Sequence, residues 1–343
     1  MATSGSVVGT NVRRGNRAEG EVEFPGASPG KRRGPGGALL PERQPRRCGR
    51  GSPAQPQLPR QPPRLLSAIV CREQPQGSRA VADIEAGNAD QDPSLAPGAT
   101  VAREFSQPAA GHPRRYFATP LLATDELAFD TKHGLFADAR MRQAVNYALD
   151  RPALATALGD LVAANYLPPG LPGSLARRVY PLDGPDLARA RARAGPHGGH
   201  AVLAICSDPG CTKLGQIIRA DLACIGIRLQ LRPYAGAIGS ATTMSGADIV
   251  LARAVAPYPD PAAFFKTALG GGSGQDSLAK LSGLDRDQRV SSASQLELQL
   301  MRGPAPLAAI GTPVIPEFFS ARVRCHVFQP LEFGADLGSF CLG

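Results

Sequence analysis

Apolar positions recur with a helical period in the middle of the chain. Met141, Val145 and Leu149 are spaced four apart and fall on one face of a helix, with alanines beside them. Asp138 comes just before this stripe, and its side chain can accept a hydrogen bond from an orphan amide of the first turn. The pattern therefore predicts an amphipathic helix over 138–149.

The polar residues of this helix fall largely off the apolar stripe. They are Arg140, Arg142, Gln143 and Asn146. We expect the two arginines to be structural and to pair with Asp138 or Asp150.

The same periodicity predicts an alternation of strands and helices along the rest of the chain. Strands are expected over 120–129, 202–205, 227–232, 248–251, 307–310 and 314–319. Helices are expected over 152–158, 184–194, 212–224 and 285–301. Pro185 is expected near the first helical position of its helix, and Gly226 as a left-handed cap. Alternating strands and helices indicate a mixed α/β fold.

Charge is distributed unevenly along the 343 residues. The chain has 38 Lys+Arg and 29 Asp+Glu, but residues 1–80 hold 14 of the basic residues and only 5 of the acidic ones. The excess positive charge therefore lies in that segment, which is also rich in Gly, Pro and Gln. Such a composition cannot bury enough apolar surface to offset the entropy of ordering the chain. We expect residues 1–115 to be a disordered tail and residues 116–343 to form an α/β domain.

The beginning of the chain does not resemble an export signal. Its first 30 residues contain no apolar run of the length that a signal peptide needs. The run 65–71 is short and ends in Cys71, but it lies far from Met1. No stretch approaches the roughly 20 apolar residues of a transmembrane helix.

Five segments resemble hallmarks of one family, in the family's order. They are LAFDTKHGLFADARMRQAVNYALDR (127–151), YLPPGLPG (166–173), the strand–helix–strand segment 202–234, YPDPAAFF (258–265), and the ending FFSARVRC with a later QP and CL (318–342). They are similar to the extracytoplasmic solute-binding proteins, family 5, which deliver peptides and nickel chelates to ABC importers. The resemblance covers the carboxyl-terminal half of such proteins.

The resemblance implies a periplasmic-binding-protein-like type II fold. Residues 120–300 would form the distal lobe, and the carboxyl end would return to the proximal lobe, of which only part is present. Residues 1–115 do not resemble the family's long amino-terminal half, so the chain is expected to be truncated or frameshifted there. The return segment is then expected to lack some of its sheet partners. The family also implies a periplasmic or otherwise extracytoplasmic, membrane-associated location.

The seven cysteines suggest disulfides more than a metal site. They are Cys48, Cys71, Cys206, Cys211, Cys224, Cys325 and Cys341. Cys206 and Cys211 enclose a tight Asp-Pro-Gly turn that a disulfide can close, and Cys325 and Cys341 flank the final strand. Both pairs match cysteine positions in a subgroup of the family, which implies two disulfides and an oxidising compartment.

A zinc site is the alternative for these cysteines. It needs four converging ligands, and the five histidines are not spaced with the cysteines to supply them. No metal or other cofactor is therefore expected. Cys224 is expected to be a buried free thiol, and Cys48 and Cys71 to be unpaired.

The ligand-binding residues implied by the resemblance are only partly present. In the family, an acidic residue before the Tyr-Pro-Asp-Pro signature holds the ligand's amino group, and an aromatic residue stands three positions earlier. Here these positions are Pro257 and Ala254. The remaining candidates for ligand contact are Arg253, Tyr258 and Asp260.

Each candidate also has a structural interpretation. Asp260 can instead cap the helix that starts at Pro261, Tyr258 can pack in the hinge, and Arg253 can be a solvated arginine at a strand end. Catalytic motifs are absent from the sequence: it contains no Gly-x-Ser-x-Gly, no HExxH and no phosphate-binding loop with its lysine. The sequence therefore favours a binding protein over an enzyme.

Three functional hypotheses remain open. The first is the substrate-binding component of an ABC importer, which captures a peptide or similar small solute and delivers it to permease and ATPase subunits at the membrane. The second is a non-functional truncated fragment of such a protein. The third is polyanion or nucleic-acid binding through the basic tail, although the tail lacks the interleaved aromatic residues that stack on bases.

Overall fold

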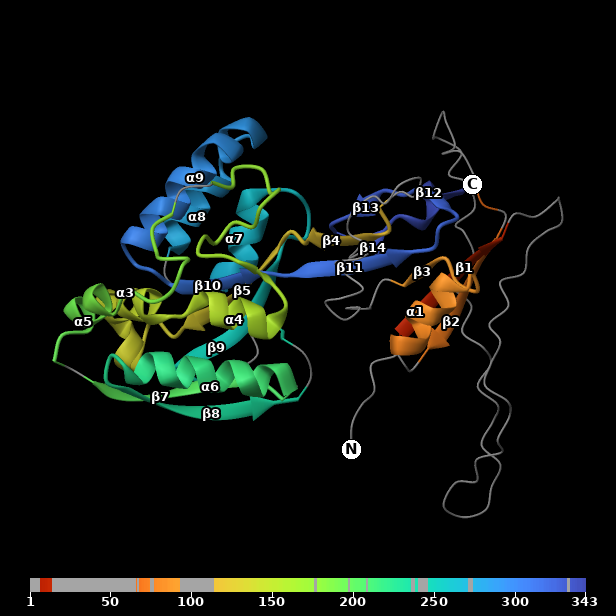
Figure 1. Ribbon diagram of the computed structural model, residues 1–343. Helices are drawn as coiled ribbons and strands as arrows, with labels where there is room; N and C mark the ends of the chain where they lie inside the picture. Colours follow the sequence, from red (N-terminus) through yellow and green to blue (C-terminus); the bar gives the residue numbers. More distant parts are fainter. Residues whose placement is uncertain are drawn as a thin grey trace, which may run out of the picture. The chain divides into compact units, whose positions relative to one another are not determined.

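The computed structural model divides the chain into two compact units. It describes residues 7–13, 66, 68–74, 77–92, 114–175, 178–196, 198–207, 209–235, 238–239, 246–270, 274–331 and 334–343. The first unit takes in 1–119 and 315–343, and the second spans 120–314 (Figure 1). The chain therefore passes between the units twice, and each unit is described by itself.

The second unit is built on a six-stranded sheet with the strand order β6-β10-β5-β9-β7-β8. In chain order its strands are β5 (Ala123–Phe129), β6 (Leu161–Val162), β7 (Gly199–Cys206), β8 (Ile227–Tyr234), β9 (Ile249–Val255) and β10 (Leu307–Thr312). β7 runs parallel to β8 and β9, whereas β5 is antiparallel to β9 and β10. The sheet thus contains both parallel and antiparallel pairs, and the unit has the α/β class that the alternation of elements predicted.

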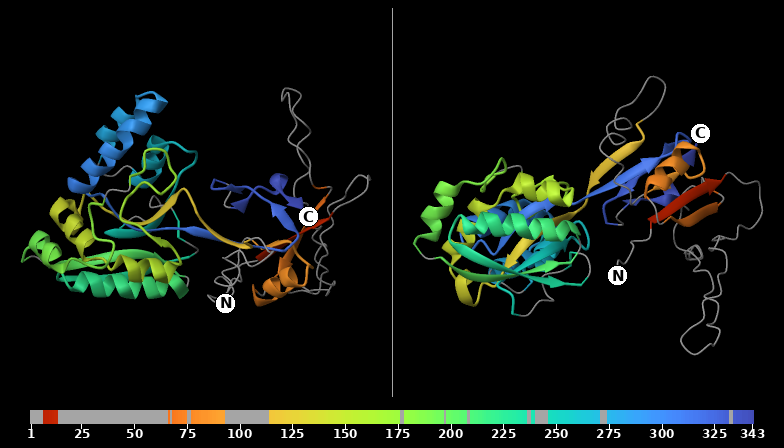
Figure 2. Two further views of the ribbon diagram at one scale, coloured as in Figure 1. Left: turned by 45° about the horizontal axis from the view of Figure 1, so that its top comes forward. Right: turned by 60° about the horizontal axis from the view of Figure 1, so that its bottom comes forward.

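Helices cover both faces of this sheet. They are α3 (Ala139–Ala148), α4 (Arg151–Leu158), α5 (Leu187–Ala194), α6 (Pro209–Ala223), α7 (Pro261–Leu269), α8 (Gln275–Ser282) and α9 (Arg286–Arg302), with the short 3-10 helix η1 (Gly134–Ala137) before α3. α6 lies along β7 and β8 (Figure 1). The blue α9 and the green α6 stand on opposite sides of the strands (Figure 2, left).

One hydrophobic core joins α3, α4 and α6 to the sheet. Its side chains come from alternate strand residues and from the predicted stripe of α3, and they include Leu127, Leu203, Ile227, Leu251, Met141, Val145, Leu149, Leu214 and Ile218. Alternation places these strand residues on a single face. The core confirms the apolar pattern on which the helix over 138–149 was predicted.

The hallmark helix begins as its sequence predicted but buries more than its apolar stripe. Asp138 caps it by accepting a hydrogen bond from the amide of Arg140. Arg142, Gln143 and Asn146, expected off the stripe, are buried as well. They donate to main-chain oxygens of the segment that leads from α9 into β10, at Pro304, Arg302, Gly303 and Leu307.

The expected ion pair of Arg142 is therefore wrong. Its guanidinium donates to the carbonyl groups of Phe136, Ala137 and Pro304 and not to Asp138 or Asp150. These carbonyls lie at the end of η1 and in the approach to β10, which the local sequence pattern does not bring together. A buried guanidinium with several donors suits such a cluster of carbonyl oxygens.

Two other helices start later or earlier than predicted. α5 begins at Leu187 because Asp186 is its N-cap, accepting from the amide of Arg189, so Pro185 lies outside the helix. α4 begins at Arg151 with Asp150 as its cap. In both cases the helix begins directly after an aspartate, because an aspartate side chain is a strongly preferred N-cap.

The first unit joins residues near the amino end to the carboxyl-terminal strands. Its sheet has the order β2-β1-β3-β11-β4. These strands are β1 (Val7–Arg13), β2 (Ala68–Gln74), β3 (Gln91–Asp92), β4 (Tyr116–Pro120) and β11 (Val314–Phe319), with helix α1 (Gly77–Glu85) between β2 and β3. β11 therefore has neighbours on both sides, β3 and β4, which corrects the expectation that the return segment lacks partners.

Side chains reinforce this pairing. The buried carboxylate of Asp90 accepts from Ser320 and Arg322, each at 2.8 Å, and Gln91 donates to Glu317 at 3.0 Å. The unit ends in the small strands β12 (Val323–Cys325), β13 (Phe328–Gln329), β14 (Gly334–Ala335) and β15 (Cys341–Leu342), with the 3-10 helix η3 (Leu337–Ser339) before β15. The predicted tail over 1–115 thus includes four described elements, its other residues lie mostly outside the described ones, and the domain boundary at 115 stays a prediction.

Candidate ligand-binding site on the six-stranded unit

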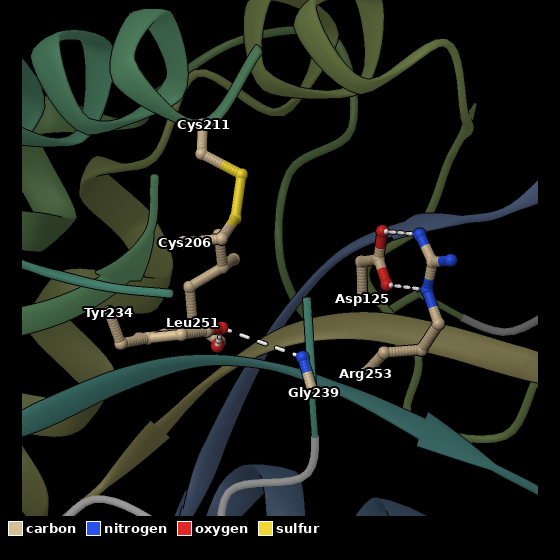
Figure 3. Close-up of a disulfide and its surroundings, with 7 residues drawn as sticks. All are labelled: Asp125, Cys206, Cys211, Tyr234, Gly239, Leu251 and Arg253. Carbon is tan, nitrogen blue, oxygen red and sulfur yellow. Dashed lines mark hydrogen bonds and ion pairs between the residues drawn. A yellow bond between two sulfur atoms is a disulfide. The ribbon is translucent and has the colours of Figure 1, made fainter. Parts of the chain in front are cut away.

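An arginine held by two bonds is the main feature of one end of the six-stranded sheet. Asp125 on β5 and Arg253 on β9 are direct partners in the strand register. Nε of Arg253 donates to Oδ1 of Asp125 at 2.6 Å, and Nη2 donates to Oδ2 at 2.7 Å (Figure 3). Burial alone would lower the pKa of Arg253, but the hydrogen bonds and the charge of Asp125 outweigh it and raise the pKa. Arg253 is therefore a fixed cation.

One donor group of this guanidinium is not used by Asp125. The third nitrogen, Nη1, points away from Asp125 (Figure 3), and no hydrogen bond to it is found among the described residues. The Arg253 side chain is 31% exposed, whereas that of Asp125 is fully buried. A solvated arginine was the structural alternative at this position, and the structure shows a bidentate ion pair on a partly exposed side chain.

The neighbouring strand ends hold Arg253 from its main-chain side. Its amide donates to the carbonyl of Gly239 at 2.9 Å. The amide of Gly239 donates to the hydroxyl of Tyr234 at 3.5 Å. That hydroxyl donates in turn to the carbonyl of Leu251 at 3.0 Å (Figure 3). These contacts connect the end of β8 and the segment after it to β9 at two positions, Leu251 and Arg253.

The cysteine pairs lie at bonding distance as expected. Cys206, beside Tyr234 in the strand register, is joined to Cys211, with their Cα atoms 5.6 Å apart. This disulfide links the end of β7 to the first turn of α6 (Figure 3). In the other unit, Cys325 and Cys341 are joined across β12 and β15.

A second carboxyl group stands close to the ion pair. Asp160 follows α4, and its Oδ2 atom is buried without a hydrogen-bond partner among the described residues. Burial, followed by the charge of Asp125, raises the pKa of Asp160 to about 8. The close approach needs glycine at residue 311 of β10, since a Cβ atom there would lie 2.6 Å from Oδ2. Burial and the neighbouring Asp125 therefore both favour the protonated form of Asp160.

Tyr258 and Asp260 differ sharply in their surroundings. Tyr258 is 57% exposed. Asp260 is buried and uses both oxygens: Oδ1 accepts from the amides of Ala262 and Ala263, and Oδ2 accepts from Arg289 at 2.9 Å. Asp260 is thus the N-cap of α7, as the structural interpretation predicted, and its contact with a ligand stays a prediction.

Apolar side chains are exposed beside Asp160. Leu161 and Val162 form the edge strand β6 and are 48% and 40% exposed. β6 pairs with β10, where Gly311 is the partner of both Val162 and Asp125. The ion pair, Asp160 and two exposed apolar side chains therefore lie near one another at one end of the sheet.

Two surface hollows of the unit lie elsewhere. One of about 390 Å³ is lined by His200, Val202, Arg228, Gln230 and Asp248 on β7, β8 and the turn before β9. The other, about 300 Å³, lies between α8 and α9 and includes Lys280 and Gln295. Neither contains a predicted ligand-binding residue, so hollow size does not select the site.

Two other predictions concern cysteine and metal chemistry. Cys224 was expected to be buried, but it is exposed: α6 ends at Ala223, so Cys224 lies in the following turn instead of on the buried stripe. In the part of the chain that the structure describes, no three His, Cys, Asp or Glu side chains are grouped so that they would hold a metal ion. None of the described helices has the length and hydrophobicity of a membrane-crossing segment.

Sequence reasoning found Arg253 but missed both carboxyl groups around it. Asp125 and Glu126 interrupt the apolar strand predicted over 120–129, and two acidic residues within a buried strand are a signal that was not used. Asp160 had no comparable signal, because its position beside Asp125 depends on a contact between β10 and the turn after α4.

The sequence decides the family. Residues 60–276, more than half of the chain, match the bacterial extracellular solute-binding proteins, family 5 Middle. The chain belongs to this family. Its members are binding proteins, and the expected fold class, an α/β periplasmic-binding-protein-like fold, is confirmed by solved structures. No curated protein matches the chain.

Three solved structures illustrate the shared fold of this family 5 protein. HbpA2 from Haemophilus parasuis has 17% sequence identity and a TM-score of 0.65, with 80% of this chain and 58% of that chain covered. A putative peptide binding protein, AppA from Clostridium difficile, has 14% identity and a TM-score of 0.66, covering 80% and 61%. DppA from Helicobacter pylori, in complex with peptide STSA, has 20% identity and a TM-score of 0.57, covering 79% and 57%. The chain thus spans less than two thirds of the structures it matches.

Proposed function

We propose that this family 5 protein binds peptides or similar small solutes through a carboxylate anchored on Arg253, and delivers them to an ABC importer. The single observation that carries the proposal is the guanidinium of Arg253, fixed by Asp125 at two points with its third nitrogen unused. The family match supports a solute-binding role, and the solved relative in complex with a peptide supports this class of ligand.

The geometry suits a ligand carboxylate for a physical reason. Arg253 loses little side-chain entropy on binding because two of its nitrogens are already fixed. A charge-assisted hydrogen bond from Nη1 to a carboxylate is stronger than a neutral one. The negative charge of Asp125 neutralises the positive charge of Arg253, so the pair has no net charge. The proposed site therefore selects its ligand by hydrogen-bond geometry more than by net charge.

Neighbouring side chains extend the proposed site. Exposed Leu161 and Val162 offer apolar contact to a ligand side chain, since both lie on the strand that follows Asp160. Tyr258 offers an exposed ring for stacking. Asp260 acts here through its cap on α7, although direct contact with the ligand remains part of the original prediction.

The partners and location follow from the family and are also proposals. An ABC permease and its ATPase subunits would receive the solute at the membrane. An extracytoplasmic location agrees with two cysteine pairs at bonding distance. The chemistry is reversible binding, with no catalytic step assigned to any residue.

Thermal unfolding of the full chain with a pool of di- to pentapeptides tests the proposal. A ligand that binds only the native state raises the free energy of unfolding by about 2.7 kcal/mol at a concentration 100 times its Kd. We expect a higher midpoint with the pool, and peptides recovered from the complex by mass spectrometry. A cooperative transition that no peptide shifts would reject peptides as the ligand, and the absence of a transition would favour the fragment hypothesis.

A further inference from the structure

Three exposed arginines surround one buried glutamine where α3, α5 and the end of α9 lie side by side (Figure 1). Oε1 of Gln143 on α3 accepts from Nη1 of Arg193 on α5 at 2.6 Å. Its Nε2 atom donates to the carbonyl of Arg302, the last residue of α9, at 2.9 Å. Arg140 stands three residues before Gln143, on the same face of α3. We call Arg140, Arg193 and Arg302 the arginine patch.

The charges of the arginine patch are not neutralised by ion pairs. Arg193 is bonded to a neutral amide, whereas Arg253 is bonded to a carboxylate. None of the three patch side chains takes part in an ion pair among the described residues. The acids nearest in sequence are the N-caps Asp138 and Asp186, and Asp186 already pairs with Arg189. With these caps, α3, α5 and the last turn of α9 hold five exposed arginines against two aspartates, a net charge of +3.

The helix macrodipole explains only part of this arrangement. A cation in the last turn of a helix is favourable, which accounts for Arg193 and Arg302. Arg140 stands in the first turn of α3, where the dipole disfavours a cation. Stabilisation of helix ends therefore does not explain why the three cations share one surface.

We propose that the arginine patch is an interaction surface for the phosphate groups of an anionic lipid bilayer. All three cations are arginines, whose planar guanidinium binds two phosphate oxygens at once. Neither of the two surface hollows of the unit is lined by them, so the patch suits an extended charged surface more than a small enclosed anion. This surface is separate from the carboxylate anchor at Arg253, which lies on β9.

The side chains around the patch favour a lipid surface over other anionic partners. The centre of a protein interface is apolar and often aromatic, and single-stranded nucleic acid stacks on aromatic rings. Among the described residues, the large apolar side chains that are exposed belong to other parts of the chain: Leu161 and Val162 on β6, Tyr258 before α7 and Val327 after β12. Binding through the patch is therefore electrostatic, and it should weaken as salt screens the charges.

Flotation of the full chain with lipid vesicles tests this surface. The vesicles consist of phosphatidylcholine alone or with about one-third phosphatidylglycerol, which makes them anionic. The test variant combines Arg140→Gln, Arg193→Gln and Arg302→Gln. Each basic residue at an anionic membrane surface strengthens binding about fivefold, so three lost charges should weaken it about a hundredfold.

A charge-matched control separates the patch from net charge. It combines Lys213→Gln, Lys280→Gln and Arg286→Gln, three exposed cations on other parts of the same unit. All proteins keep residues 1–80, which hold 14 basic and 5 acidic residues, so that segment contributes equally throughout. We expect the control to bind anionic vesicles within about threefold of wild type. Equal losses in the control and the test variant would overturn the proposal.

Other outcomes would assign the patch to a different anion. Wild type that binds both kinds of vesicle alike, or neither, would reject the lipid surface. Displacement from the vesicles by millimolar inorganic phosphate at constant ionic strength would indicate a site for a free phosphate group. A DNA duplex that binds wild type more tightly than the vesicles do, but not the test variant, would indicate nucleic acid. Either result would overturn the proposal.

A second variant keeps the test valid if the loss of Arg193 disturbs its contact with Gln143. Arg140→Gln with Arg302→Gln removes only side chains that make no hydrogen bond or ion pair in the described part of the chain. Its thermal midpoint should equal that of wild type, and its binding to anionic vesicles should be about thirtyfold weaker. A double variant that folds and binds as wild type does would contradict the arginine patch.

Discussion

Arg253 and Asp125 face each other across β9 and β5 and are joined by two hydrogen bonds of 2.6 and 2.7 Å. Because Asp125 is fully buried and Arg253 is partly exposed, the carboxylate holds the guanidinium in place at the surface. Removing either partner leaves an uncompensated charge, so this pair shapes both the stability and the binding of the unit.

The buried pair Arg151 and Asn146 gives a prediction about stability. Arg151 is fully buried. It donates to the carbonyls of Ala309 and Asn146, to the side-chain oxygen of Asn146 at 3.0 Å, and to Pro181. Burial lowers its pKa to about 10, so it stays charged at pH 7. Arg151→Met would leave these acceptors without donors and should reduce the free energy of unfolding by about 3 kcal/mol or more.

The control for that variant is Arg140→Met. Arg140 lies in the neighbouring helix α3, but its side chain is exposed, so its loss should change stability by less than about 0.5 kcal/mol. Denaturant unfolding of both variants compares them directly. Equal costs would contradict the role of Arg151 as the buried link between α4 and β10.

Glu297 predicts an unusual pH dependence. It lies buried on α9, accepts from the amide of Leu167 at 2.8 Å, and has one oxygen without a described partner. Burial raises its pKa to about 7, so the native state favours the protonated acid. The protonated Glu297 therefore contributes fully to the free energy of unfolding below the pKa that it has in the unfolded chain. This contribution is lost as the pH rises to about 7, its pKa in the native state. Glu297→Gln should remove about 2–3 kcal/mol of this pH dependence between pH 5 and pH 8.

An exposed acid on the same helix provides the comparison for Glu297. Asp287→Asn, in the first turn of α9, should leave the pH dependence as in wild type. The free energy of unfolding is measured in urea at both pH values. If the difference in unfolding free energy between wild type and Glu297→Gln is the same at pH 5 and at pH 8, the raised pKa of Glu297 is refuted.

Asp260 allows its cap and its possible ligand contact to be separated. Asp260→Ala removes the N-cap of α7 and the partner of Arg289, so it should cost about 2 kcal/mol. Asp260→Asn keeps a capping oxygen and should cost clearly less. Peptide affinity should be near that of wild type in Asp260→Asn. A variant that unfolds like wild type but no longer binds would instead assign Asp260 to the ligand.

The cysteines predict a simple labelling pattern. Without reductant, Cys224 should react with a thiol reagent in the native protein, because it is exposed. Cys206, Cys211, Cys325 and Cys341 should react only after reduction. Reducing the disulfides Cys206–Cys211 and Cys325–Cys341, with sequence separations of 5 and 16, should lower the free energy of unfolding by about 2 and about 3 kcal/mol respectively. Labelling of either pair in oxidised protein would contradict the disulfides.

Local sequence patterns predicted the elements well because they record local causes. The stripe of Met141, Val145 and Leu149 is buried, and the caps at Asp138 and Asp260 formed where aspartate precedes a helix. Gly226 adopts a positive φ of 79°, as a turn residue after α6 was expected to do. These features depend on neighbours within a few residues.

Long-range contacts explain what the sequence did not reveal. The helical pattern predicts that Asn146 lies at the surface, but its hydrogen-bond partner Leu307 lies 161 residues later in the chain. The local pattern predicts a solvated cation at a strand end for Arg253, because its partner Asp125 lies 128 residues earlier in the chain. The ion pair at the site depends on such a contact, so the sequence could propose Arg253, Tyr258 and Asp260 but not the partner of Arg253.

The most direct test compares one tripeptide with a free carboxyl end and the same tripeptide as an amide. Their Kd values are measured by calorimetry at pH 6 with wild type, Arg253→Gln and the control Arg140→Gln. We predict that wild type and the control bind the free acid about tenfold or more tightly than the amide, and that Arg253→Gln loses this preference. Equal binding of acid and amide by wild type would contradict the carboxylate anchor.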